Sequence, residues 1–231
     1  MPAKIIRTPD DPHNSRAVVY SPDHDDKTRT RPLGHIYYDR KTGRMMVREK
    51  VRPRYFVGLD LGQTSDYTAM AVVEKTEAGL SVSSLERVNG RPYPNIVSRV
   101  ADYLSRPPLA DQYLLVVDAT GVGRGVVDMI RSAGISPIAL TITGAARVTG
   151  SKRAPRVPKV DLIEGLLLAF QSGTIKIAAE LEHAPTLSRE LTELRRKISA
   201  NGHVSFGVWR EGEHDDLILA LAMAVWTAER P

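Results

Sequence analysis

The chain has 231 residues, of which 42% are hydrophobic and 26% are charged, a balance typical of a globular protein with one sizeable core. It contains no cysteine, which excludes disulfides, zinc–thiolate sites and iron–sulfur clusters and is typical of a reducing cytoplasm. The net charge of +5 favours a polyanionic partner such as a nucleic acid, because clustered Lys and Arg displace the counterions condensed on it. The sequence shows no secretory signal and no apolar run of the about 20 residues that a bilayer requires, so we expect a cytoplasmic protein without a membrane span.

The first 53 residues are predicted to form an N-terminal arm or linker. Residues 1–34 contain five prolines and almost no apolar periodicity, so they have little surface to bury on folding. The apolar stretches 36–38 and 45–47 flank a turn that contains Gly43, a pattern that indicates a short hairpin. We therefore expect residues 54–231 to form the folded domain.

The domain opens with three strands joined by short connections, which predicts an antiparallel meander. A helix then crosses over to a fourth strand, and the connection is long enough for that strand to run parallel to the first. A further helix and a fifth strand predict an α/β fold in which helices cover both faces of a mixed sheet. The expected strands cover about residues 55–61, 68–75, 81–88, 113–118 and 137–142, and the helices about residues 94–105 and 121–132.

The C-terminal part is predicted to be mainly helical. Apolar residues recur at helical spacing over residues 160–171, and a second, charged helix is expected at 186–197. A hairpin at 198–209 turns at Asn201-Gly202, a dipeptide that tolerates the positive φ angles of a type I′ turn. The final helix begins near Leu217 and is apolar on nearly all sides, so we expect it to be buried against the sheet.

Asp60 follows Leu59 in an apolar strand, where a charge must be paired, protonated or bound to a cation. Its neighbours in sequence point to the opposite face of the sheet, so they cannot neutralise it. Asp118 ends a second apolar strand that is predicted to lie beside the first, so both carboxylates can reach one metal site. The alternatives are a salt bridge from Asp60 to a core arginine and a role for Asp118 in shaping a strand-to-helix turn.

An acidic segment at residues 213–216 precedes the final helix. Asp215 and Asp216 could serve only as an N-cap and a first-turn anion, because the helix dipole favours both. A buried helix would instead bring them to the strand ends, beside Asp60 and Asp118. The sequence therefore predicts a cluster of carboxylates.

Oxygen ligands without cysteine or clustered histidine favour Mg²⁺ or Mn²⁺ over zinc. Two such ions would activate water on one side of a phosphodiester and stabilise the leaving oxygen on the other, which predicts an endonuclease. Asp66 is interpreted as an outer ligand or a turn residue. His214 is interpreted as a contact to metal or phosphate, or as a surface residue.

Positive charge is concentrated in two segments. Residues 147–159 carry five basic residues and no acid, and their Gly and Pro disfavour regular structure, so we expect a mobile loop that suits a phosphate backbone. Residues 195–197 form the second segment, and a solvated surface is the alternative for both. The candidate DNA-binding residues are Arg147, Lys152, Arg153, Arg156, Lys159, Arg195, Arg196 and Lys197.

Residues 54–230 resemble the nuclease domain of phage terminase large subunits, a branch of the RNase H-like superfamily. The resemblance rests on GLDLGQTSDYTA at 58–69, VDATGVG at 117–123 and EHDDL at 213–217, which agree in order and spacing. It implies an RNase H-like mixed sheet and a hairpin at 198–209 that could gate DNA entry. It also implies a metal-binding catalytic triad of Asp60, Asp118 and one of Asp215 and Asp216, with Asp66 as an accessory acid.

The same resemblance implies cleavage of double-stranded viral DNA with two Mg²⁺ or Mn²⁺ ions. The implied partners are this DNA, a packaging ATPase, a small terminase subunit and the portal. The chain lacks the GxxxxGK[ST] loop of the packaging ATPase, so only the nuclease half is expected.

Three other functions are compatible with the motifs. One is a junction-resolving nuclease of the same fold. Another is an actin-like or sugar-kinase-type ATP-binding protein, whose first phosphate loop also reads Asp-x-Gly followed by Thr, as at residues 60–64. Such proteins need two lobes around the nucleotide, whereas this chain has room for one. The third is a DNA-docking module with a vestigial site, which the retained acids disfavour.

Overall fold

The computed structural model describes residues 54–62, 66–198, 204–207 and 214–230 with their side chains, and the backbone of four strands nearer the N-terminus. The chain divides into two compact units, residues 1–52 and residues 53–231. The first unit contains an antiparallel sheet with the strand order β1-β2-β3-β4. Its strands are β1 (Lys4–Ile6), β2 (Ala17–Pro22), β3 (Thr30–Asp39) and β4 (Arg44–Glu49).

The β3-β4 pair lies where the sequence indicates a hairpin, with Asp39 opposite Arg44. The strands β1 and β2 lie in the stretch that was expected to be an extended arm, and they are a difference from that expectation. The run Val18-Val19-Tyr20 favours a strand, because β-branched and aromatic residues fit a pleated surface. That residues 1–53 serve as an arm or linker to a nuclease domain stays a prediction.

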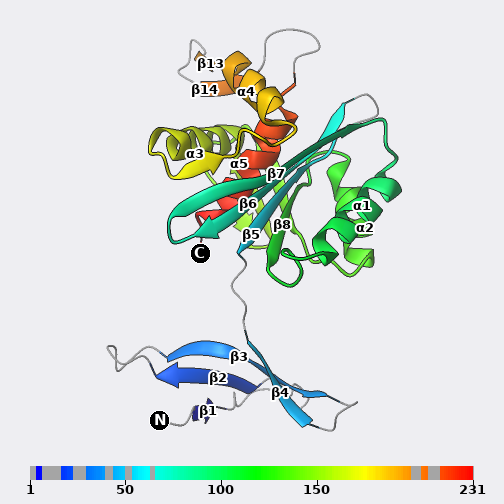
Figure 1. The fold of residues 1–231 in the computed structure, drawn as a ribbon, viewed down its shortest axis with the longest axis vertical. Helices are drawn as coiled ribbons and strands as arrows, with labels where there is room; N and C mark the ends of the chain where they lie inside the picture. Colours follow the sequence, from blue (N-terminus) through cyan, green and yellow to red (C-terminus); the bar gives the residue numbers. More distant parts are fainter. Residues whose placement is uncertain are drawn as a thin grey trace. The chain divides into compact units, whose positions relative to one another are not determined.

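The second unit is built on an eight-stranded sheet with the order β10-β11-β9-β8-β5-β6-β7-β12 (Figure 1). The strands β5, β6 and β7 are antiparallel, whereas β8 runs parallel to β5, β9 to β8, and β11 to β9. This order confirms the predicted mixed sheet. The strands are β5 (Tyr55–Asp60), β6 (Tyr67–Thr76), β7 (Gly79–Asn89), β8 (Tyr113–Asp118), β9 (Ile138–Thr143), β10 (Thr149–Ser151), β11 (Ala154–Pro158) and β12 (Ile175–Ile177).

Helices cover both faces of this sheet (Figure 1). One face carries α1 (Tyr93–Ser105) and α2 (Gly123–Ser132), and the other carries α3 (Lys159–Gln171) and α5 (Asp216–Ala228). A further helix, α4 (Ala184–Glu193), contacts α5 and leads to an antiparallel pair of strands, β13 (Arg195–Ile198) and β14 (Val204–Gly207).

Side chains alternate between the two faces along β5. Val57 and Leu59 belong to the apolar cluster beneath α1 and α2, whereas Phe56 belongs to the cluster beneath α3 and α5. Asp60 follows Phe56 by four residues, so the two side chains point to the same face of the sheet. Its carboxylate therefore lies on the face that α5 covers.

The helix α5 lies directly on β5. Twelve of its 13 residues are buried, as expected for a helix that is apolar on nearly all sides. Gly58 permits the contact, because a Cβ atom at this position would lie 1.9 Å from the carbonyl oxygen of Ala220. This close approach brings the acidic start of α5 to the end of β5 at which Asp60 stands.

Three parts of the second unit differ from the predicted pattern. Residues 147–159, expected to be a mobile loop, contain β10 and β11, because Val157 is buried in the core and β11 pairs with β9. The charged helix expected at 186–197 ends at Glu193, and the next residues form β13. The strand β12 was not predicted, because a run of three residues carries no detectable period. The Asn201-Gly202 turn lies outside the described residues.

Among the described residues, no helix is both long enough and apolar enough to span a membrane.

Candidate metal centre

Asp60 and Asp118 stand at the ends of two neighbouring parallel strands. In the pairing of β5 with β8, Leu59 lies opposite Val117. The residues that follow them, Asp60 and Asp118, therefore lie side by side. Leu59 and Val117 both belong to the cluster beneath α1 and α2, so the two aspartates share the opposite face. Adjacent strands are about 4.8 Å apart, which is close enough for both carboxylates to bind one cation.

The carboxyl group of Asp60 is in an unfavourable environment for a negative charge. It is 8% exposed, and burial raises its pKa well above the ordinary value. Repulsion from Asp118, Asp216 and Asp215 raises this pKa further, and the ammonium group of Lys159 lowers it. Within the described residues no arginine pairs with Asp60, which disfavours the salt-bridge interpretation.

Asp118 is held at the turn that leads into α2. Its Oδ1 accepts hydrogen bonds from the backbone N–H of Thr120 at 2.8 Å and from the hydroxyl of Thr120 at 2.5 Å. The Thr120 hydroxyl oxygen in turn accepts a hydrogen bond from the backbone of Ile142 at 3.0 Å. Burial raises the pKa of Asp118, and the hydrogen bonds from Thr120 act against the rise. Asp118 thus shapes its turn and also faces Asp60.

Gly123 explains part of the VDATGVG segment. A Cβ atom at this position would lie 2.1 Å from the carbonyl oxygen of Asp118. The glycine therefore lets α2 begin directly against the end of β8.

Neither aspartate at the start of α5 caps this helix. Asp215 occupies the N-cap position but makes no side-chain capping hydrogen bond. The backbone N–H of Ile218 instead donates to Oε2 of Glu190, on α4, at 3.1 Å. Because Glu190 accepts from a first-turn amide that has no partner within the helix, the Asp215 and Asp216 side chains remain available for other partners.

Both aspartates form ion pairs with cations of the protein. The Nζ of Lys159 donates to Oδ2 of Asp215 at 2.6 Å, and the Nη2 of Arg87 donates to Oδ2 of Asp216 at 3.0 Å. Burial raises the pKa of Asp216, whereas the Arg87 guanidinium lowers it. Lys159, predicted to bind DNA, therefore lies among the carboxylates.

Sequence reasoning missed Arg87 and Glu190. Arg87 could have been found from the alternation of side chains along β7. Leu85 belongs to the cluster beneath α3 and α5, and Arg87, two residues later, lies on the same face of the sheet. An arginine on a buried strand face requires an acidic partner. A similar signal marks Glu190, which stands three residues after Leu187 and four before Leu194, on the apolar side of the predicted helix.

His214 and Asp66 lie at the edge of this cluster. The Nδ1 of His214 is 3.7 Å from Oδ2 of Asp216, and its ring meets that of Tyr67 edge-on, with 5.1 Å between the centroids. Asp66 is exposed and lines a small pocket together with Gly62. The roles of Asp66 and His214 as metal contacts stay predictions.

The donor atoms present fit a hard divalent cation at Asp60 and Asp118. Both offer carboxylate oxygens, and a bound cation would relieve the repulsion that raises the pKa of Asp60. In the present arrangement, no group of three or more metal-binding side chains is close enough to hold an ion within the described residues. Both candidates for a third carboxylate ligand are held in ion pairs, Asp215 with Lys159 and Asp216 with Arg87.

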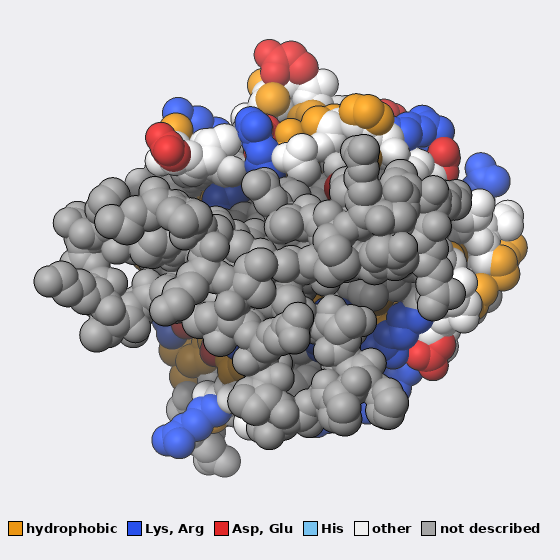
Figure 2. Space-filling model, turned by 90° about the horizontal axis from the view of Figure 1, so that it is seen from below, with side chains coloured by type: hydrophobic (Ala, Val, Ile, Leu, Met, Phe, Trp, Pro, Cys, Tyr) orange, Lys and Arg blue, Asp and Glu red, His pale blue; other side chains and the backbone are white. Residues whose placement is uncertain are grey.

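Most of the candidate DNA-binding residues lie on the surface. Exposed side chains on or next to the β10-β11 hairpin are those of Arg147, Lys152, Arg153 and Arg156. In the second segment, Arg195 donates to the carbonyl oxygen of Thr192 at 2.7 Å, and Arg196 lies 4.0 Å from Glu164. The described side chains visible in Figure 2 mix basic, acidic and apolar groups. DNA contact by these residues stays a prediction.

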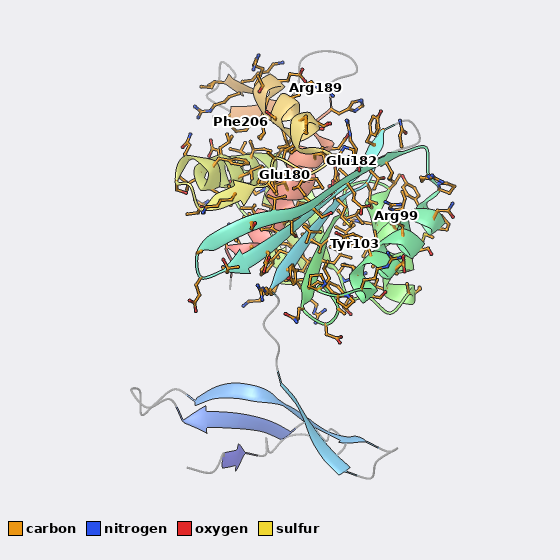
Figure 3. The ribbon with its side chains drawn as sticks, in the orientation of Figure 1. Arg99, Tyr103, Glu180, Glu182, Arg189 and Phe206 are labelled. Carbon is orange, nitrogen blue, oxygen red and sulfur yellow. The ribbon has the colours of Figure 1, made fainter. Side chains whose placement is uncertain are left out.

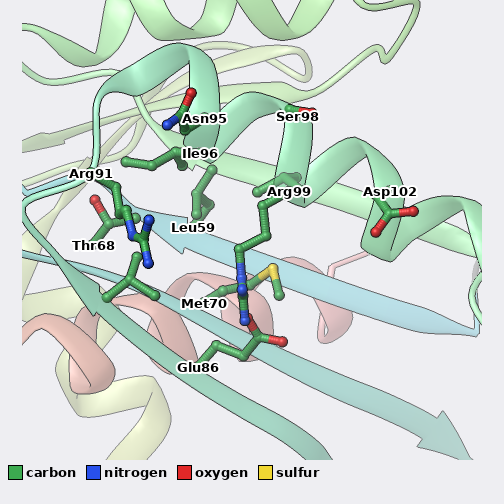
Figure 4. A pocket seen from close by; sticks show the side chains of 12 residues that line it. Leu59, Thr68, Met70, Glu86, Arg91, Asn95, Ile96, Ser98, Arg99 and Asp102 are labelled. Carbon is green, nitrogen blue, oxygen red and sulfur yellow. The ribbon is translucent and has the colours of Figure 1, made fainter.

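A separate pocket of about 460 Å³ lies between α1 and the strands β5, β6 and β7 (Figure 4). Leu59 and Met70 form part of its apolar floor, and Arg99 forms an ion pair with Glu86 at 2.8 Å beside it. The residues that line the pocket include none of the four clustered aspartates. It therefore lies on the other face of the sheet from the metal centre.

Comparison with known families identifies the family of this chain. The family model described as the terminase RNaseH-like domain matches residues 57–227, which include Asp60, Asp118 and the start of α5. The chain belongs to this family. It is a terminase RNaseH-like domain. The family resemblance of the three motifs is thereby confirmed.

Several solved structures that are similar to this terminase domain come from phages. The large terminase nuclease of thermophilic phage G20c with bound magnesium is 22% identical, with a TM-score of 0.57 over 94% of this chain and 89% of that chain. The large terminase nuclease domain of Thermus phage P74-26 is 24% identical, with a TM-score of 0.53 over 74% of this chain and 77% of that chain. At these identities the similarity shows the fold. No curated protein matches the chain.

Proposed function

We propose that this terminase nuclease domain is a metal-dependent endonuclease that cleaves double-stranded DNA. The ligands of its Mg²⁺ or Mn²⁺ ions are Asp60, Asp118 and one aspartate of the 215–216 pair. The observation that carries the proposal is the side-by-side placement of Asp60 and Asp118, where burial and mutual repulsion raise the pKa of Asp60. Crystal structures of the G20c large terminase nuclease with bound magnesium and with bound cobalt support the assignment of a divalent ion.

Two ions at this site would activate water on one side of the scissile phosphodiester and stabilise the leaving oxygen on the other. Other parts of the chain hold and orient the aspartates that bind the ions. Thr120 fixes one oxygen of Asp118, and β5 holds Asp60 next to it. Asp66 serves as an outer ligand and His214 as a contact to metal or phosphate.

The basic side chains of residues 147–156 and 195–197 bind the phosphate backbone of the substrate. Such contacts are independent of sequence, so cleavage tolerates many DNA sequences. The chain spans 40% of the large terminase of a second thermophilic bacteriophage, to which it is 13% identical with a TM-score of 0.58 over 78% of its own length. From the resemblance of the motifs to terminase large subunits, a packaging ATPase, a small terminase subunit and the portal are proposed as partners.

A plasmid-nicking assay tests the metal site. Wild-type protein should nick and linearise supercoiled DNA with Mg²⁺ or Mn²⁺, and EDTA should abolish the reaction. Asp60→Asn and Asp118→Asn preserve the side-chain shape and should lower the rate by about 100-fold or more, because each removes a ligand charge. Asp128→Asn, at an exposed aspartate of α2, is the matched control and should cut like wild type. Full activity of both ligand variants would refute the site.

Cleavage of a four-way DNA junction and of linear duplex, together with ATP binding, separates the remaining alternatives. A junction-resolving nuclease would cut a four-way DNA junction in strong preference to linear duplex. An actin-like protein would bind ATP and leave both DNA substrates intact. We expect duplex cleavage without a preference for the junction.

A further inference from the structure

A buried group of charges lies directly behind the acidic start of α5. Glu190 from α4, Arg87 from β7 and Asp216 from α5 meet there, with side chains that are 3%, 9% and 13% exposed, respectively. The Arg87 guanidinium also lies over the ring of Tyr67, 3.7 Å from the centroid, and this stacking restricts its position. Buried charges are costly unless each has a partner, so the distribution of partners within this group is informative.

The two carboxylate oxygens of Glu190 have different surroundings. Oε2 accepts the hydrogen bond from the backbone N–H of Ile218 and so holds the first turn of α5. Oε1 lies 3.8 Å from Nη2 of Arg87, beyond hydrogen-bonding distance. Within the described residues, Oε1 of Glu190 and Nε of Arg87 are both buried without a hydrogen-bond partner. The two neighbouring charged groups therefore each keep one buried atom without a hydrogen bond.

We propose that Glu190 is a positioning residue of the metal centre. Through Oε2 it fixes the start of α5, and through Oε1 it offers Arg87 a second anion. Asp216 can then release Arg87 and turn to a divalent ion without leaving the guanidinium unpaired in the interior. This inference rests on the proposed function, because it assumes that the aspartate cluster binds a divalent ion.

Metal affinity tests the inference without reference to cleavage. Glu190→Gln keeps a carbonyl oxygen for the Ile218 amide but removes the negative charge that faces Arg87. Calorimetric titration with Mn²⁺ at about pH 8, where carboxylates are normally ionised, should show an about tenfold weaker Kd for this variant. Its thermal midpoint at this pH should not fall below that of wild type, because the helix cap is retained. Glu182→Gln removes an exposed carboxylate just before α4 (Figure 3) and should bind Mn²⁺ like wild type.

A double-mutant cycle distinguishes positioning from a loss of stability. Because Glu190 is inferred to act through Arg87, the effect of Glu190→Gln on the Mn²⁺ Kd should disappear in an Arg87→Met background. The double variant replaces one buried cation and one buried anion of the group by neutral side chains, so the net charge of the group is unchanged. A wild-type Kd in Glu190→Gln, or equal weakening in both backgrounds, overturns the inference.

DNA cleavage measured on the same samples separates the two proposals. If wild-type protein binds Mn²⁺ and cuts DNA while Glu190→Gln matches it in both respects, only the inference about Glu190 fails. If wild-type protein binds no Mn²⁺, the proposed function and the inference both fail. The expected result is weaker Mn²⁺ binding and a lower kcat in Glu190→Gln, with an unchanged KM for DNA.

Discussion

Lys159 donates a 2.6 Å hydrogen bond to Asp215 and so places an ammonium group within the aspartate cluster. The same ammonium lowers the pKa values of Asp60 and Asp118. In the metal-free protein, Lys159 therefore offsets part of the repulsion that a divalent cation would otherwise remove.

Lys159→Gln should destabilise the protein specifically when metal is absent. In EDTA we expect a loss of about 1–2 kcal/mol, or about 2–8 °C in the thermal midpoint, because a partly buried ion pair is broken. Added Mg²⁺ should restore most of this loss by occupying the cluster. Lys152→Gln, at an exposed lysine, is the control. Equal losses with and without Mg²⁺ would contradict a role for Lys159 among the carboxylates.

Gly58→Ala should displace α5 from β5. The new Cβ would lie 1.9 Å from the Ala220 carbonyl oxygen, so we expect a destabilisation of about 1–3 kcal/mol in urea unfolding. Gly125→Ala provides a control of opposite sign, because a Cβ there has no atom within 4 Å and alanine favours a helix by about 0.5–1 kcal/mol. The same shift of α5 should weaken Mg²⁺ binding. Unchanged stability of Gly58→Ala would mean that α5 does not pack on β5 in this way.

Thr120→Val should impair the orientation of Asp118 and leave the fold intact. The change removes the hydroxyl that donates to Asp118 and accepts from Ile142. We expect an about tenfold lower rate of DNA cleavage, because an outer hydrogen bond orients a ligand carboxylate. Thr120→Ser keeps the hydroxyl and should recover most of the rate. A wild-type rate in Thr120→Val would show that the hydrogen bonds of the hydroxyl are not needed for cleavage.

Protein stability should fall with rising pH because of Glu190. Burial raises its pKa from 4.5 to about 7, although the hydrogen bond from Ile218 and the charge of Arg87 lower it. The unfolded chain loses this proton near pH 4.5, whereas the folded protein keeps it until about pH 7. The neutral carboxyl group therefore stabilises the fold fully below pH 4.5, and this contribution is lost as the pH rises to about 7.

Urea unfolding of metal-free protein at several pH values measures this effect. Between pH 4.5 and about 7, wild-type protein should lose of the order of 3 kcal/mol more free energy of unfolding than Glu190→Gln. Comparison with the Gln variant removes the contributions of the other raised carboxyl groups, which have the same sign. Parallel pH profiles for the two proteins would show that Glu190 has an ordinary pKa.

The sequence by itself was sufficient for the order and type of most elements in the second unit. Strand alternation and helical period are local properties, so they predicted β5 to β9 and the helices α1, α2, α3 and α5. It also placed Asp60, Asp118 and the 215–216 pair at element ends, because a charge next to an apolar strand or helix is visible in the residues themselves. The same local patterns failed at β10 and β11, whose pairing with β9 depends on distant residues.

Only the tertiary structure decided how the charged groups are distributed around the site. The register of β5 with β8 puts Asp60 beside Asp118, and no local pattern specifies a register between strands from different parts of the chain. Packing of α3 and α4 against the start of α5 moves Lys159 from the expected DNA surface into the cluster and makes Glu190 the helix cap. Ion pairs and caps between distant residues depend on positions in space, and these exist only after the apolar faces of the sheet and helices have packed together.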